Sequence, residues 1–217
     1  MCIFGGRNSS DRKFIFMKKL YNTFALAVMS GIMIGFGGVV FLMCENRVIG
    51  SVLFSFGLLT IVCQGFALYT GRVGYFRQYG WAQMAATLAG NAVGTFLMGK
   101  LFTLTRLPVV DAVQGIVATK LADSSLSLFV LAVGCGAMMY LAVDNYRKSQ
   151  SWLFIIFPIV IFILSGFEHS IANMFYLSLA DAWGWEAVRL TVIGIIGNAV
   201  GSWLVNAGNF LLKEKEE

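Results

Sequence analysis

Charge is scarce in this sequence, and so are proline and histidine. Asp, Glu, Lys and Arg together make up 12% of the 217 residues, whereas 58% are hydrophobic. An ordinary soluble domain is about a quarter charged and about half apolar, so a soluble chain of this composition would have a core with almost no polar shell. Only two prolines interrupt the apolar runs, which favours long helices. The composition argues against a soluble domain and predicts an all-α membrane protein in contact with the lipid bilayer.

Sequence patterns for catalysis, metal binding and nucleic-acid binding are also missing. The four cysteines, at positions 2, 44, 63 and 135, form no C-x-x-C pair or Cys/His cluster, so neither a metal site nor a disulfide framework is predicted. The sequence has no nucleophile elbow or phosphate loop, so we expect neither an enzyme nor a cofactor. The net charge of +5 comes from basic residues at the ends of apolar segments, which argues against nucleic acid as a partner.

The apolar runs predict one transmembrane domain over residues 1–217 with six spans. Four of the spans are continuous and cover approximately residues 22–44, 81–101, 112–143 and 188–212. The second span starts at about residue 48 and is broken at 64–71, and the fifth starts at residue 152 and is broken at 164–175. The fourth span is uneven, because polar residues at 120–125 separate its apolar start from its main run at 126–143. The N-terminal apolar run is too long for a signal peptide, and residues 13–17 fit a short interfacial helix before the first span.

An even number of spans places both termini on one side of the membrane. Eleven of the sixteen Lys and Arg residues fall on the side of the termini, including Arg72 and Arg147 in turns between spans, and five fall on the other side, including Lys120 and, in the first turn, Arg47. Basic residues are enriched on the cytoplasmic side of membrane proteins. We therefore expect the N-terminal segment 1–21 and the tail 213–217 to lie in the cytoplasm.

A repeat divides the chain into two halves. The sequence GNAVG occurs at 90–94 and again at 197–201, and Gly-Phe occurs inside each predicted break. The order of the two features is the same in both halves, so we predict two three-span units, 22–103 and 104–212, with the second inverted relative to the first. The repeated glycines and asparagines fit helix packing rather than contact with a permeant: Gly90, Asn91, Gly94, Gly197, Asn198 and Gly201.

The second break contains the only histidine, His169, beside Glu168. Polar and ionisable side chains at membrane depth are costly and usually mark a functional site. A broken helix exposes backbone groups that need protein or water partners, and the positive ends of the half-helices favour an anion. The candidate residues of the two breaks are Gly65, Tyr69, Gly71, Ser165, Gly166, Glu168, Ser170 and Asn173.

Three side chains have competing interpretations. His169 is either a pore residue facing the hydroxyl of Thr70, which occupies the matching place in the first break, or a neutral imidazole bonded to a backbone carbonyl. Lys120 either faces the pathway, extends to the membrane interface, or pairs with Asp123 on one helix. Glu168 is more often an orienting partner than a catalytic acid in such a setting, and these alternatives stay open at this point.

The stretch at 165–174, SGFEHSIANM, looks like the signature of the formate/nitrite transporter family. The six spans, the two breaks and the paired GN-x-x-G motifs resemble that family too. The resemblance implies a homopentamer of aquaporin-like protomers in a prokaryotic inner or plasma membrane, each with its own pore for small monovalent anions. By position, His169 resembles the central pore histidine, Thr70 its hydroxyl partner and Lys120 the vestibule lysine, while the apolar constriction residues correspond to Leu58, Leu68, Phe54 and Phe162.

Two departures from the formate and nitrite members point to another branch. Tyr69 stands where those members have phenylalanine, and Gly136 where they have asparagine. These changes and the exit TGRVG at 70–74 resemble the hydrosulfide-channel branch. We therefore predict a channel for anions of weak acids, with hydrosulfide favoured and formate and nitrite also possible. The alternatives are a neutral-solute or water channel of the same architecture and a membrane scaffold that transports nothing.

Overall fold

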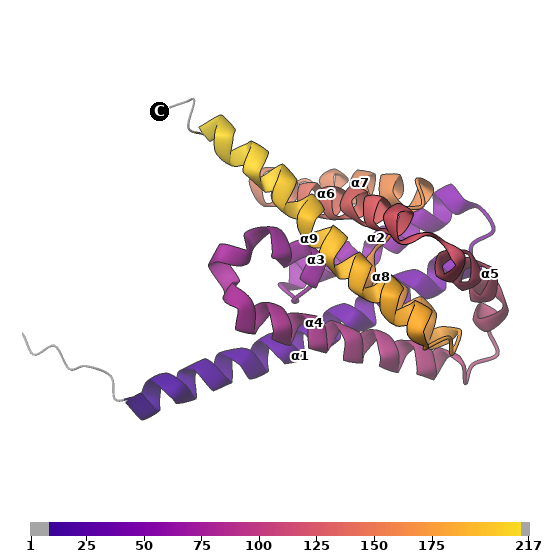
Figure 1. Ribbon diagram of the computed structural model, residues 1–217, viewed down its shortest axis with the longest axis horizontal. Helices are drawn as coiled ribbons and strands as arrows, with labels where there is room; N and C mark the ends of the chain where they lie inside the picture. Colours follow the sequence, from indigo (N-terminus) through magenta and orange to yellow (C-terminus); the bar gives the residue numbers. More distant parts are fainter. Residues whose placement is uncertain (1–8, 214–217) are drawn as a thin grey trace, which may run out of the picture.

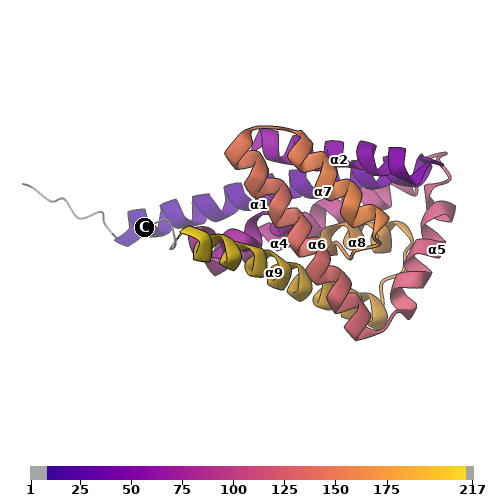
Figure 2. The same cartoon turned by 90° about the horizontal axis from the view of Figure 1, so that it is seen from above.

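The computed structural model describes residues 9–213, and every regular element among them is helical (Figure 1). The elements are α1 (Ser9–Met43), α2 (Arg47–Gln64), α3 (Tyr69–Arg72), a 3₁₀ turn (Val73–Tyr75), α4 (Phe76–Phe102), α5 (Val109–Ala122), α6 (Ser125–Ser149), α7 (Leu153–Leu164), α8 (Ser170–Leu179) and α9 (Trp185–Lys213). Figures 1 and 2 show the start of α1 and the end of α9 at the same end of the molecule, with α5 lying across the opposite end.

Within residues 9–213, four helical segments are long and apolar enough to cross a membrane: Ser10–Met43, Arg47–Gln64, Ser125–Ser149 and Trp185–Asn209. The third expected span is present as α4, whose backbone kinks at Gly80. The fifth is divided into the shorter apolar helices α7 and α8. The apolar helices therefore lie where the hydropathy of the sequence predicts them.

The start of the first helix differs from the sequence prediction. The expected interfacial helix at 13–17 is not separate, because α1 runs unbroken from Ser9 to Met43. Within α1, no glycine or proline precedes Gly31 to end the helix earlier. At about 1.5 Å per residue the 35 residues of α1 exceed the thickness of a bilayer core, and its first turns extend beyond the other helices (Figure 1). The four residues at the C-terminus, 214–217, lie outside the described part of the chain.

The fourth predicted span is two helices rather than one. α5 ends before Asp123, whose backbone is extended. The side chain of Ser124 then caps α6 by accepting a hydrogen bond from the amide of Ser127. Because α5 is a separate helix across the end of the molecule, Lys120 lies on it and not within the span that follows.

Two interruptions of the helices have the same geometry. We call residues 65–68 the first break and 165–169 the second break. Gly65 and Gly166 both have φ of 71°, a left-handed conformation that glycine adopts without strain. The amide of Phe66 then donates to the carbonyl of Ile61, as that of Phe167 does to Phe162. This pattern closes the end of a helix, so α2 and α7 stop at equivalent points.

Asn91 of α4 holds the first break in place. Its side-chain amide donates to the carbonyls of Ala27 and Ala67, both at 2.8 Å, and its Oδ1 accepts from the amide of Tyr69 at 2.8 Å. The residue is completely buried. Asn91 therefore supplies partners to backbone groups on both sides of the break and ties them to α1.

Asn198 of α9 makes the equivalent contacts in the second half. Its side-chain amide donates to the carbonyls of Ala132 and Glu168 at 2.9 and 2.8 Å, and its Oδ1 accepts from the amide of Ser170 at 2.9 Å. The glycines of the two GNAVG motifs lie where α1 meets α4 and α6 meets α9. A Cβ added to Gly94 or Gly201 would overlap a carbonyl oxygen of the neighbouring helix, so both pairs of helices pack at close range.

Candidate functional site

A buried hydrogen bond joins Thr70, in the short helix that follows the first break, to His169 at the end of the second break. Thr70 Oγ1 lies 2.9 Å from His169 Nε2, and the residues are 1% and 2% exposed. His169 is also the N-cap of α8, because its Nδ1 accepts a hydrogen bond from the amide of Ala172 at 3.0 Å. The imidazole is thus bonded to a backbone amide and a hydroxyl, rather than to the backbone carbonyl that one sequence interpretation allowed.

These two contacts determine the tautomer of the ring. A ring nitrogen that accepts a hydrogen bond carries no proton, and a neutral imidazole has its proton on the other nitrogen. Since Nδ1 accepts from Ala172, the proton of neutral His169 is on Nε2. Nε2–H therefore donates to Thr70 Oγ1, and the capping contact orients this donor.

Lys120, Glu168 and Asn173 form a second polar group next to His169. Lys120 Nζ lies 2.6 Å from Glu168 Oε2, and Asn173 Nδ2 donates to the same oxygen at 2.7 Å. The side chains of Lys120 and Glu168 are 16% and 5% exposed. Lys120 neither pairs with Asp123 nor extends away from the protein. The carboxylate of Asp123 instead accepts from the backbone of Ser124 and the hydroxyl of Ser127.

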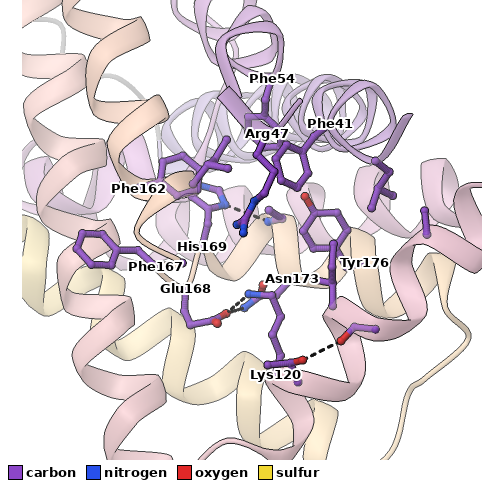
Figure 3. A pocket seen from close by; sticks show the side chains of 18 of the residues that line it. Phe41, Arg47, Phe54, Lys120, Phe162, Phe167, Glu168, His169, Asn173 and Tyr176 are labelled. Atoms are coloured by element: carbon purple, nitrogen blue, oxygen red, sulfur yellow. Dashed lines mark hydrogen bonds and ion pairs between the residues drawn. The ribbon is translucent and has the colours of Figure 1, made fainter. Parts of the chain in front are cut away.

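His169 lines a cavity of about 540 Å³ together with Lys120, Glu168 and Asn173, and we call it the first cavity. Figure 3 shows Lys120 and Asn173 directed at Glu168, with His169 and Phe162 above them in this view. Arg47, the first residue of α2, also points into this cavity. The sequence analysis had placed Arg47 in a turn only. The available signal was its position on the same side of the membrane as Lys120 in the count of basic residues.

A second cavity of about 390 Å³ lies at the other end of α2. The first cavity contacts α2 at Arg47 and Phe54, whereas the second contacts it from Leu58 to the C-terminal turn. Two arginines that the sequence analysis had assigned to turns, Arg72 and Arg147, line the second cavity. Basic side chains therefore lie in cavities at both ends of α2.

Four large, buried apolar side chains line the two cavities. Phe54 and Phe162 line the first cavity, with ring centroids 6.1 Å apart in an edge-to-face arrangement. Leu58 and Leu68 line the second. All four are at most 4% exposed, and the ring of Phe162 stacks on the imidazole of His169 at 5.7 Å.

Comparisons with known proteins identify the fold and the family. The sequence model described as formate/nitrite transporter matches residues 9–211. The chain belongs to the formate/nitrite transporter family. The formate channel FocA of Escherichia coli K12 is 28% identical over 186 residues, which cover 72% of this chain and 65% of FocA. The nitrite transporter NirC of the same strain is 27% identical over 211 residues, which cover 85% of this chain and 76% of NirC.

Solved structures of the family share the fold of this integral membrane protein. A structure titled "Pentameric formate channel with formate bound" superposes with a TM-score of 0.73 at 23% identity, covering 91% of this chain and 96% of that one. A structure titled "FNT family ion channel" gives a TM-score of 0.77 at 21% identity, covering 89% and 90%. The relatives named here are channels and transporters, not enzymes.

In this member of the formate/nitrite transporter family, the two departures from the formate and nitrite pattern lie away from the cavities. The hydroxyl of Tyr69 donates to the carbonyl of Ile195. A Cβ at Gly136 would overlap the backbone of Asn198, so this position is a contact between α6 and α9. Gly136 is therefore a packing position at which no side chain fits. Neither residue is among those in the described range that line the two cavities.

The remaining break residues have structural surroundings. Gly71 lines the second cavity, and Gly65 and Gly166 end the preceding helices. Ser165 is the C-cap of α7. The hydroxyl of Ser170 is buried and has no hydrogen-bond partner within the described residues.

Proposed function

We propose that this protein is a channel for small monovalent anions of weak acids. The observation that carries the proposal is the buried hydrogen bond between His169 and Thr70, which lies between two cavities lined by basic side chains. Buried polar pairs at membrane depth are costly and are kept where a polar solute passes. Formate and nitrite are the solutes named for the bacterial relatives FocA and NirC.

The proposed arrangement in the membrane has six spans in two inverted, aquaporin-like units, residues 22–103 and 104–212. α1, α2 with α3, and α4 form the first unit, while α6, α7 with α8, and α9 form the second. The matching hydrogen bonds of Asn91 and Asn198 support this repeat. Both termini would lie in the cytoplasm of a prokaryotic cell, so that the first cavity faces outward and the second faces inward.

The proposed assembly is a homopentamer with one pore in each protomer. One similar structure is titled as a pentamer, and this chain exposes large apolar side chains that need lipid or a neighbouring protomer. Among them, Phe56, Phe157 and Leu204 are more than 60% exposed. Residues on this surface are expected to contact lipid or the adjacent copies.

The geometry suggests how an anion would cross. Arg47 and Lys120 would attract it into the first cavity, where Glu168 holds the ammonium of Lys120 against the wall. A charge at the centre of a bilayer costs about 2.5–3.5 kcal/mol even where the surroundings relax. Nε2–H of His169 would lower this cost by donating to the anion. The protonated form of a weak acid would pass the apolar side chains at still lower cost.

The sequence around the first break bears on which anion the channel prefers. We favour hydrosulfide, with formate and nitrite as the other candidates, because the sequence at 68–74 resembles the hydrosulfide branch. Tyr69 lines neither cavity, so its influence on selectivity would be indirect, through the position of Thr70. A neutral-solute channel is the second candidate, and it is favoured by the carboxylate of Glu168, which offsets the charge of Lys120.

Uptake into proteoliposomes tests the proposal. Purified protein is compared with empty vesicles for hydrosulfide, formate, nitrite and acetate, with glycerol as the neutral control. We expect the anions to enter faster than glycerol, with hydrosulfide ahead of formate. Formate or nitrite ahead of hydrosulfide would overturn the preference alone. Glycerol entering while every anion fails would overturn the anion channel.

A further inference from the structure

The second cavity contains two arginines that are oriented by aromatic rings. The guanidinium of Arg72 lies 4.8 Å from the ring centroid of Tyr79, and that of Arg147 lies 4.3 Å from the ring centroid of Tyr75. Arg147 Nη2 also donates to the hydroxyl of Tyr79 at 3.4 Å. Stacking of this kind fixes the plane of a guanidinium while leaving its N–H groups free to donate. The rings thus hold both cations at the wall of one cavity.

Neither arginine takes part in an ion pair within residues 9–213. The four pairs in that range join Lys100 to Asp181, Lys120 to Glu168, Lys148 to Asp144 and Arg189 to Glu186. Asp144 is the carboxylate on the same helix as Arg147. Its oxygens are already held by Lys148 at 2.6 Å, Tyr75 at 2.8 Å and Asn209 at 3.2 Å.

Two like charges in a cavity repel one another, and an anion between them would relieve the repulsion. The first cavity differs, because Glu168 lies against Lys120 there. A guanidinium donates two parallel N–H groups, which match the two oxygens of a carboxylate or nitrite. The second cavity therefore has the charge and the donors of an anion site without a carboxylate of its own among its described lining residues.

We propose that Arg72 and Arg147 form a second anion-binding site at the inner end of the pathway, where a small monovalent anion is held before or after it passes Leu58 and Leu68. That the bound anion is also the transported one rests on the proposed channel function. The binding itself does not, because it depends only on the two charges and the cavity that they line.

Cys63 makes this site measurable without any transport assay. It lines the same cavity, is exposed, and has its Sγ 3.4 Å from the hydroxyl of Tyr146. Cys44 lines the first cavity and Cys135 is completely buried. In a Cys2→Ser, Cys44→Ser background, Cys63 is therefore the thiol that water-soluble reagents reach.

The experiment compares two methanethiosulfonate reagents of opposite charge on the purified full-length protein in detergent. One carries a sulfonate and the other a trimethylammonium group, and each rate at Cys63 is divided by its rate with free mercaptoethanol. We expect the normalised ratio to favour the sulfonate by about tenfold at low ionic strength and to fall in 0.5 M salt, which screens charge. Sodium formate should slow the sulfonate reaction. A Cys63→Ser protein should not react.

Variants assign the effect to the two arginines. Arg72→Gln and Arg147→Gln should each lower the sulfonate preference several-fold, and formate should protect Cys63 less in both. Arg77→Gln is the matched control, because Arg77 is an exposed residue close to Arg72 in the chain that does not line the cavity. Equal rates for the two reagents, a preference unchanged in both arginine variants, or no protection by formate would each overturn the proposal.

The outcomes also separate this site from the channel function. If the anions fail to cross proteoliposomes while formate still protects Cys63, the site stands and the channel assignment falls. If the anions cross and Cys63 shows no preference for the sulfonate, the channel stands and the inner site falls.

Discussion

Replacement of Lys120 by methionine should destabilise the protein, and a second replacement, Glu168→Gln, should restore most of the loss. Lys120 Nζ lies 2.6 Å from a carboxylate whose side chain is only 5% exposed. Methionine keeps much of the length and the apolar stem of lysine but removes the ammonium group. The buried carboxylate would then keep Asn173 as its side-chain donor within the described residues.

The structure sets the size of the effect. Removal of one partner from a buried ion pair costs about 3–5 kcal/mol. We expect about 2–3 kcal/mol here, because Asn173 still donates to the carboxylate and the side chain of Lys120 is 16% exposed to the cavity. In a chain of this length that corresponds to a fall in Tm of roughly 4–12 °C. The double variant has no buried charge at this point, so its free energy of unfolding should be within about 1 kcal/mol of that of the parent.

Thermal unfolding in detergent, followed by tryptophan fluorescence, measures the four members of this double-mutant cycle. Lys148→Met is the matched control, since the side chain of Lys148 is 58% exposed in its pair with Asp144, and such surface pairs contribute about 1 kcal/mol or less. A Lys120→Met protein as stable as the parent would refute the reasoning. So would a double variant that is less stable than either single variant.

Three further predictions follow from the breaks and the buried pair. Asn198→Ala should lower stability by about 2 kcal/mol or more, because it leaves the amide of Ser170 and the carbonyl of Glu168 unpaired at about 1–3 kcal/mol each; a Tm near that of the parent in the same unfolding assay would contradict this. Gly166→Ala should cost about 1–2 kcal/mol for its left-handed backbone at φ 71°, and an unchanged Tm would show that the chain avoids this strain. Thr70→Val should lower anion uptake by proteoliposomes at least several-fold, because Nε2–H of His169 loses its partner. The control Thr87→Val, whose hydroxyl bonds only to its own helix, should transport like the parent, and equal uptake by both variants would contradict a role for Thr70.

The sequence allowed the contact between Thr70 and His169 to be predicted, because the repeat aligned the two breaks. Their atoms lie 2.9 Å apart in the structure. It also indicated that Asn91 and Asn198 bond between helices. The sequence could not indicate that these asparagines bond to the breaks themselves, since the partners lie far from them along the chain and only the packing of the helices brings them together.

The ion-pair partner of Lys120 could not be predicted from the sequence. Its ion-pair partner Glu168 is 48 residues away, whereas Asp123 was the carboxylate visible nearby. The arginines of the cavities were counted as turn residues, because a count of basic residues indicates a side of the membrane and not the direction of a side chain. Arg47, Arg72 and Arg147 line cavities because the helices that carry them begin or end there.

The most direct test of the account is formate uptake by proteoliposomes that contain the parent or His169→Asn, measured from pH 5 to pH 8. Asparagine is a favoured N-cap, so its Oδ1 can replace Nδ1 as the acceptor for the amide of Ala172 while Nε2 is lost. The account predicts rapid uptake by the parent, and in the variant a loss of at least tenfold with a changed pH dependence. Parent-like uptake by His169→Asn at every pH would contradict it, because the imidazole would then be only a cap of α8.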